Sequence, residues 1–232
     1  MLDSIASVFV PIHKDGHKFL ALFGLVTVLL FYFLPDFFGW IGVILTLWCA
    51  YFFRDPDRVT PMRDGLIISP ADGRVCAIDD VVPPSELELG PERVTRICVF
   101  MNVFDVHVNR APQAGRITSI NYIPGKFFNA ELDKASDHNE RQGFTIELKD
   151  GSKIGMVQIA GLVARRIIKF VEEGDHVGAG ERLGLIRFGS RVDVYLPPGK
   201  SAQVCIGQLA LAGETVLADL SSDEPEREAR RA

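Results

Sequence analysis

The bond between Gly189 and Ser190 is the place in this sequence where residue types and spacing could support chemistry. Apolar and polar residues alternate over 183–187 and 192–196, which predicts two strands that meet at a tight glycine turn. A serine hydroxyl directly after glycine can reach the preceding carbonyl carbon. Attack there would convert the amide to an ester and expose the chain to cleavage. An isolated Gly-Ser pair is more often an ordinary turn, so its surroundings must decide.

These surroundings resemble those of the phosphatidylserine decarboxylase family. The resemblance is carried by residues 172–181, by the Gly189-Ser190 pair and by residues 192–197. It extends over about residues 54–219 and is closest to the short form of the family. The resemblance implies that the protein cuts its own Gly189–Ser190 bond and that Ser190 becomes an N-terminal pyruvoyl group.

Two further segments resemble elements of the same family. Residues 69–75 contain Asp72 and resemble its Asp-Gly element, and residues 104–112 contain His107 and resemble its histidine element. A serine hydroxyl is a weak nucleophile unless a base takes its proton, and an imidazole can accept and return that proton near neutral pH. We therefore expect Ser190 as the nucleophile, His107 as the base and Asp72 as the carboxylate that orients the imidazole. Without this family context, Asp72-Gly73 would be interpreted as a common turn and His107 as a structural histidine.

The resemblance also implies the cofactor, a covalent pyruvoyl group made from Ser190, and no metal. Attack by Ser190 on the Gly189 carbonyl gives an ester, elimination leaves dehydroalanine, and loss of ammonia leaves the pyruvoyl end. Its ketone would form a Schiff base with a primary amine of the substrate. The adjacent carbonyl would accept electrons as carbon dioxide leaves, as pyridoxal phosphate does in other decarboxylases. His107 is the expected proton donor to the resulting carbanion.

Three features leave the division of roles open. Asp105 lies two residues before His107 and would share its face in a strand, so its carboxylate competes with Asp72 as the orienting group. Many longer members of the family carry a second histidine at the position of Arg110, which leaves open whether His107 serves both self-cleavage and decarboxylation. The run Asn139-Glu140-Arg141 resembles an element of the short form, and we expect it to contact the substrate.

The composition excludes several other classes of function. The net charge of −5 over 232 residues gives no indication of nucleic-acid binding. The four cysteines (Cys49, Cys76, Cys98 and Cys205) are widely spaced and form neither a CxxC pair nor a Cys/His cluster. A zinc site or a disulfide framework is therefore disfavoured, and a reducing, cytosolic setting is the simplest fit for the main domain.

The N-terminal segment predicts a helical hairpin in a membrane. Residues 19–34 and 37–53 carry no charge, and Pro35-Asp36 interrupts them. Each half is slightly short for a full crossing, so the hairpin either spans twice or dips into one leaflet. Basic residues flank the whole block (Lys14, Lys18, Arg54, Arg58 and Arg63), which places both ends in the cytoplasm. The alternative is a buried helical hairpin of a soluble protein.

After residue 58 the composition predicts a mainly β domain over 59–220, followed by a charged, flexible tail over 221–232. Short apolar runs rich in β-branched residues recur between glycine and proline. Residues 70–75 and 112–117 share a Pro-x-x-Gly phrase, and residues 174–180 and 207–213 share a second glycine phrase. These repeats indicate a duplicated hairpin, as in barrel-sandwich hybrid folds.

The prediction is a pyruvoyl-dependent enzyme at the cytoplasmic membrane that turns phosphatidylserine into phosphatidylethanolamine. It would consist of a large β chain, residues 1–189, and a small α chain, residues 190–232; a homo-oligomer is left open. One alternative is a membrane-tethered hybrid-motif carrier or binding module without catalysis, which would need an attachment lysine in a tight turn. Another is a zinc peptidase, which would need a His-x-His pair where this chain has His107-Val108-Asn109.

Overall fold

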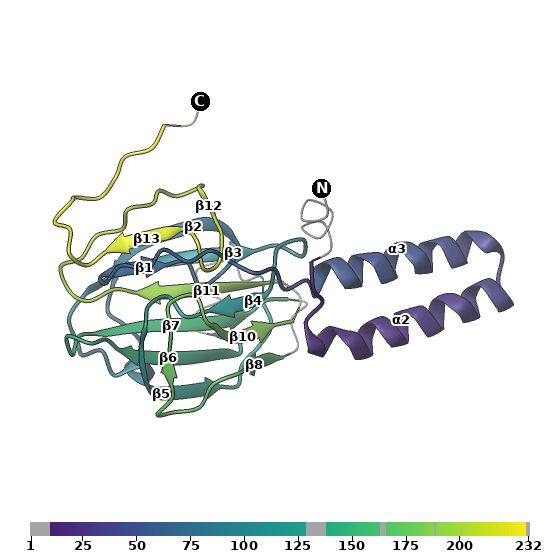
Figure 1. Cartoon of the computed structure of the whole chain (residues 1–232), viewed down its shortest axis with the longest axis horizontal. Helices are drawn as coiled ribbons and strands as arrows, with labels where there is room; N and C mark the ends of the chain where they lie inside the picture. The colour runs from purple at the N-terminus through teal and green to yellow at the C-terminus, as the bar shows by residue number, and fades with distance from the viewer. Residues whose placement is uncertain (1–9, 129–137, 163–165, 188, 231–232) are drawn as a thin grey trace. The chain divides into compact units, whose positions relative to one another are not determined.

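The computed structural model describes residues 10–128, 138–162, 166–187 and 189–230. It divides the chain into two compact units, residues 1–57 and 58–232. In the first unit, α2 (Lys14–Phe33) and α3 (Asp36–Phe52) form a hairpin (Figure 1). The helices are separated at Leu34-Pro35, because proline has no N–H to continue a helix. The predicted helical hairpin is confirmed, and its turn lies one residue before the predicted Pro35-Asp36, since Asp36 already belongs to α3.

Small and hydroxyl side chains join the two helices. The Thr27 and Thr46 hydroxyl oxygens lie 3.0 Å apart, and a Cβ on Gly42 would meet the Thr27 Oγ1 at 2.7 Å. The outward side chains are large and apolar, and Tyr32 and Phe33 are 79% and 72% exposed. By length and composition α2 could cross a membrane, whereas α3 has 17 residues. An exposed apolar surface of this kind supports membrane association.

The second unit is built from antiparallel strands. Within the described residues, eight of them form one sheet in the order β12-β2-β3-β11-β7-β6-β5-β9 (Figure 1). Their bounds are β2 Gly73–Val81, β3 Val94–Met101, β5 Gly115–Ile123, β6 Arg141–Glu147, β7 Lys153–Ala160, β9 His176–Val177, β11 Ser190–Tyr195 and β12 Leu209–Ala210. A second sheet pairs β4 (Val108–Arg110), β10 (Arg182–Ile186) and β8 (Ile167–Lys169), and a third pairs β1 (Leu66–Ile68) with β13 (Val216–Asp219). A 3-10 turn, η1, covers Ser85–Leu87. The predicted mainly β domain is confirmed.

The large sheet repeats one hairpin unit. Strands β2 and β5 are both nine residues long, and each has a register shift just after its third residue, Val75 or Ile117. The carbonyl of Val75 accepts a hydrogen bond from Gly207 at 2.8 Å, and that of Ile117 accepts one from Gly174 at the same distance. Strands β12 and β9, which follow these glycines, close the two ends of the sheet. The duplication therefore comes from the two glycine phrases seen in the sequence.

The two halves of the sheet meet at β11, which lies between β3 and β7. Every residue of β11 is buried. Because side chains alternate along a strand, Ser190 shares the face of Val192 and Val194, which belong to the main apolar core. Arg191 and Asp193 lie on the other face, where they form a bidentate ion pair of 2.7 and 2.9 Å. Burial alone would lower the pKa of Arg191, but the charge of Asp193 raises it above its ordinary value.

Candidate active site

Ser190 begins β11 and has no exposed surface. Its Oγ has no hydrogen-bond partner among the described residues. A buried hydroxyl without a partner costs about 1–3 kcal/mol and is therefore rare. Gly189, the residue before it, has a φ of +68°, in the left-handed region that favours glycine. The junction thus holds a desolvated hydroxyl directly after a glycine turn, which is the arrangement that attack on the Gly189 carbonyl needs.

The strands on the two sides of this junction are not partners of one another. Strand β10 pairs with β4 and β8, whereas β11 pairs with β3 and β7. The predicted strands and glycine turn are present, but the turn carries the chain from one sheet to another. Since no hairpin ladder joins β10 to β11, the junction is held by other segments.

Two hydrogen bonds hold Gly189 in place. Its N–H donates to Nε2 of His107 at 3.2 Å, and its carbonyl accepts from the N–H of Gly161 at 3.0 Å. Gly161 directly follows β7, whose last residue, Ala160, pairs with Ser190. The second bond therefore continues the β7–β11 ladder by one residue and fixes the carbonyl that Ser190 would attack.

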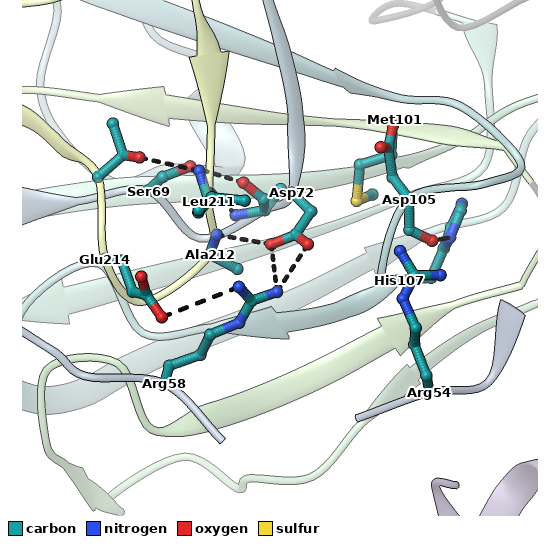
Figure 2. Close-up of polar contacts among 12 residues, drawn as sticks. Arg54, Arg58, Ser69, Asp72, Met101, Asp105, His107, Leu211, Ala212 and Glu214 are labelled. Carbon is teal, nitrogen blue, oxygen red and sulfur yellow. Dashed lines mark hydrogen bonds and ion pairs between the residues drawn. The ribbon is translucent and has the colours of Figure 1, made fainter. Parts of the chain in front are cut away.

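His107 is completely buried, and its contacts define its tautomer. Its Nδ1 lies 2.9 Å from the main-chain carbonyl of Asp105. A carbonyl only accepts hydrogen bonds, so Nδ1 must carry the proton. Nε2 then presents its lone pair, and it accepts from Gly189. Nε2 is therefore the basic nitrogen of the ring, and it faces the junction. Figure 2 shows the contact between the ring and Asp105 on the other side.

The carboxylate of Asp105 is the alternative candidate for the group that orients His107. Asp105 lies in a turn before β4, so the shared strand face that the sequence suggested is absent. Its carboxylate accepts a hydrogen bond from the N–H of Asn102 at 2.8 Å. The main-chain carbonyl of Asp105 is the group that contacts Nδ1 of His107.

Asp72 lies in a separate polar group (Figure 2). Its carboxylate accepts two hydrogen bonds from Nη2 of Arg58, at 2.7 and 2.9 Å, and one from the N–H of Ala212 at 2.8 Å. Arg58 Nη1 also lies 3.9 Å from Glu214. The structure brings His107 to the Gly189–Ser190 junction, and it joins Asp72 to Arg58 instead of to His107.

Comparisons with known proteins place this chain in one family. The family model for phosphatidylserine decarboxylase matches residues 45–218. The chain belongs to the phosphatidylserine decarboxylase family. A phosphatidylserine decarboxylase proenzyme from Cereibacter sphaeroides is 58% identical over 226 residues, which is 97% of each chain. The predicted family and the prediction of a decarboxylating enzyme are confirmed. The two alternatives, a non-catalytic carrier and a zinc peptidase, are no longer supported.

Two of the residues expected to bind the substrate, Asn139 and Arg141, make contacts within the protein. The side chain of Asn139 is buried and, within the described residues, bonds main-chain groups: its Nδ2 donates to Phe128 and Ala160, each at 2.8 Å, and its Oδ1 accepts from Phe128 at 2.9 Å. Arg141 pairs with Glu86 at 3.0 Å. Burial, together with the carboxylate of Glu140, raises the pKa of Tyr122. A role for Asn139, Glu140 and Arg141 in substrate binding stays a prediction.

Three residues that contact the candidate residues or their neighbours were missed by sequence reasoning. Gly161 acts through its main chain, for which a sequence has no signal. Arg58 was counted only as a basic flank of the membrane segment. Gln158, on β7, donates to Asn109 at 2.7 Å inside the core, and its Oε1 has no partner among the described residues. A buried amide in an otherwise apolar strand, Lys153–Ala160, was the available signal for Gln158.

The described residues fit a cofactor made from the chain itself. Ser190 is buried with an unpartnered Oγ, next to the bond whose cleavage would make it an N-terminus. No group of three or more His, Cys, Asp or Glu side chains suited to a metal ion occurs in the described part of the chain. Ser190 is accordingly the residue that would carry a pyruvoyl group in this decarboxylase.

Proposed function

We propose that this chain is made as a single precursor, cuts itself between Gly189 and Ser190, and then converts phosphatidylserine to phosphatidylethanolamine and carbon dioxide. The observation that carries the proposal is the junction itself. A buried, unpartnered hydroxyl follows a glycine whose N–H is bonded to the lone pair of His107. The name of the Cereibacter sphaeroides relative, a phosphatidylserine decarboxylase proenzyme, supports both the substrate and the precursor.

Self-cleavage begins when the Ser190 oxygen bonds to the Gly189 carbonyl carbon. The hydroxyl proton passes to Nε2 of His107, which must first exchange its bond to the Gly189 N–H for one to the hydroxyl. The carbon–nitrogen bond breaks as the proton moves on to the Ser190 nitrogen, and an ester and an amine result. Loss of the Ser190 α-proton breaks the Cβ–Oγ bond and releases the Gly189 carboxylate. Addition of one water and loss of ammonia leave a pyruvoyl group at residue 190.

In the mature enzyme the pyruvoyl group supplies an electron-withdrawing carbonyl for decarboxylation. The chain's own residues bind and orient the substrate and supply the proton. His107 is oriented by the hydrogen bond from its Nδ1 to the Asp105 carbonyl. We expect His107 to return a proton to the substrate carbon. The two chains, residues 1–189 and 190–232, would stay together, because β11 of the small chain lies between β3 and β7 of the large one. Asp72 stays a candidate for the orienting acid in the mature state.

The setting that we propose is the cytoplasmic face of the cytoplasmic membrane. Lys14 and Lys18 precede the apolar part of the hairpin, and Arg54 and Arg58 follow it. Basic flanks favour the cytoplasmic side at both ends. A hairpin held in this way keeps the catalytic unit on the surface that presents phospholipid head groups.

Intact mass of the purified full chain tests the proposal. We expect two species, residues 1–189 and 190–232, the second with a blocked N-terminus whose mass corresponds to a pyruvoyl group. Ser190→Ala should give a single uncut chain that releases no carbon dioxide from phosphatidylserine. An uncut wild-type chain with full decarboxylase activity would overturn the proposal.

A further inference from the structure

The carbonyl oxygen of Gly189 already accepts a hydrogen bond in the precursor. The donor is the N–H of Gly161, with 3.0 Å between the nitrogen and the oxygen. Within the described part of the chain, this is the hydrogen bond that the oxygen accepts. Gly161 is buried and Gly189 is partly buried, so the donor itself is shielded from bulk water.

The same oxygen is where charge must develop during self-cleavage. When a hydroxyl adds to a carbonyl carbon, the carbon becomes tetrahedral and its oxygen becomes an anion. A donor that is in place before the reaction stabilises this anion without reorganising, and it does so most strongly where water is excluded. A neutral hydrogen bond also strengthens when its acceptor becomes charged, so the interaction favours the transition state over the ground state.

We propose that the main-chain N–H of Gly161 is the oxyanion donor of the self-cleavage step. The inference rests on the proposed cleavage at Gly189–Ser190 and assigns to it a catalytic group outside the predicted Ser190, His107 and Asp72. The β7–β11 ladder positions the donor: Ala160 pairs with Ser190, and Gly161 continues that pairing onto Gly189.

The neighbouring polar side chains are directed elsewhere. His107 Nε2 lies on the nitrogen side of Gly189 as an acceptor. Asn109 Nδ2 points to the Pro70 carbonyl and the Met101 sulfur, each at 3.5 Å, and Gln158 Nε2 donates to Asn109. The base and the anion donor therefore approach the junction from different segments, just before β4 and just after β7, and act on different atoms.

An amide-to-ester replacement tests the donor without changing a side chain. Glycolic acid at position 161, introduced during cell-free synthesis of the full chain, replaces the N–H by an oxygen. A matched control is lactic acid at position 160, which removes the N–H that donates to the Glu140 carbonyl at 2.9 Å instead. The time course of appearance of the chain 190–232, followed by mass, is the readout.

We expect the ester at position 161 to slow cutting by about 10²–10³-fold, the loss usual for one oxyanion donor. The ester at position 160 should slow it by less than about 3-fold. Because the Gly189 carbonyl leaves as a carboxylate during maturation, carbon dioxide release per mature chain should match wild type in both. Equal cutting rates for the two esters would overturn the inference, whether both are fast or both are slow.

Melting of uncut precursors separates catalysis from folding. In a Ser190→Ala background, the two esters should unfold at similar temperatures. If the ester at position 161 alone fails to fold there, the hydrogen bond is structural and the inference is wrong. If the unmodified wild-type chain does not cut at all, the proposed function fails instead, so the two failures are distinguishable.

Discussion

The Nε2 atom of His107 accepts a hydrogen bond from the N–H of Gly189 at 3.2 Å, one residue before the bond that we expect to break. On the other side of the ring, Nδ1 donates to the Asp105 carbonyl at 2.9 Å. The imidazole is therefore fixed from both sides by main-chain groups. Its basic nitrogen faces the junction.

This arrangement predicts the behaviour of His107→Ala. Loss of a general base typically slows a reaction by about 10²–10⁴-fold, so chain cutting should slow to that extent. His138→Ala and His176→Ala, which change exposed histidines, are the matched controls and should cut like wild type. A time course of cutting, followed by carbon dioxide release from the matured fraction, measures both steps. Wild-type rates in both would contradict the assignment, and cutting without decarboxylation would confine His107 to the substrate step.

Asp105→Asn should cut within about 3-fold of wild type. The substitution keeps the main-chain carbonyl that bonds His107, and an asparagine Oδ1 can still accept from the N–H of Asn102. Nitrogen NMR of an uncut Ser190→Ala precursor should find the His107 proton on Nδ1. A proton on Nε2, or a severe loss of cutting in Asp105→Asn, would show that the carboxylate controls the ring.

The Arg58–Asp72 pair should contribute to stability. Both side chains are about nine-tenths buried, and removing one partner of such a pair leaves an uncompensated charge. Arg58→Met should therefore lower the free energy of unfolding by about 3–5 kcal/mol, measured on the uncut Ser190→Ala precursor. Lys149→Met, which breaks the exposed pair with Asp64, is the control and should change little. Unchanged stability in Arg58→Met would contradict the prediction.

Asp72→Asn separates a structural role from the orienting role expected from the sequence. If Asp72 acts only through Arg58 and Ala212, cutting should fall in proportion to the loss of folded precursor. If it orients His107 at any stage, cutting or decarboxylation should fall severely while the melting temperature stays close to that of wild type. The sequence predicts the second result: Asp72→Asn should resemble His107→Ala more than Asp105→Asn does.

Asn139→Ala should destabilise the precursor without a specific effect on substrate affinity. The asparagine amide joins Phe128 to Ala160, the residue before Gly161, and its removal takes a hydrogen bond from the buried carbonyl of Ala160. A buried acceptor left without a partner costs about 1–3 kcal/mol. Thermal unfolding of the precursor and KM for phosphatidylserine in mixed micelles measure the two effects. A large rise in KM at unchanged stability would support the substrate contact predicted from the sequence.

The helical hairpin predicts firm membrane association with both ends on one side. The full chain should sediment with membranes and resist carbonate extraction, because α2 and α3 expose large apolar side chains over most of their length. In a cysteine-free background, single cysteines beside Lys14 or Arg58 should be protected from a membrane-impermeant label in intact cells. Labelling at either position would contradict the cytoplasmic placement.

The sequence by itself determined the parts of this protein that depend on local pattern. Uncharged runs on either side of Pro35 indicated the helical hairpin, and the repeated glycine phrases indicated the duplicated strands. A serine after Gly189, within its family context, indicated the reactive junction. These features were readable because periodicity, turn residues and a serine next to glycine act over a few neighbouring positions.

Only the tertiary structure decided which groups meet at that junction. Gly161 and the carbonyl of Asp105 act through the main chain, which has the same atoms at nearly every residue and leaves no pattern. The carboxylate of Asp72 meets Arg58, 14 residues before it, and Ala212, 140 residues after it. Strands β10 and β11 belong to different sheets although only three residues separate them. Such partners follow from strand order and register, because hydrogen bonds form between groups that the sheets bring together and not between groups that adjoin in sequence.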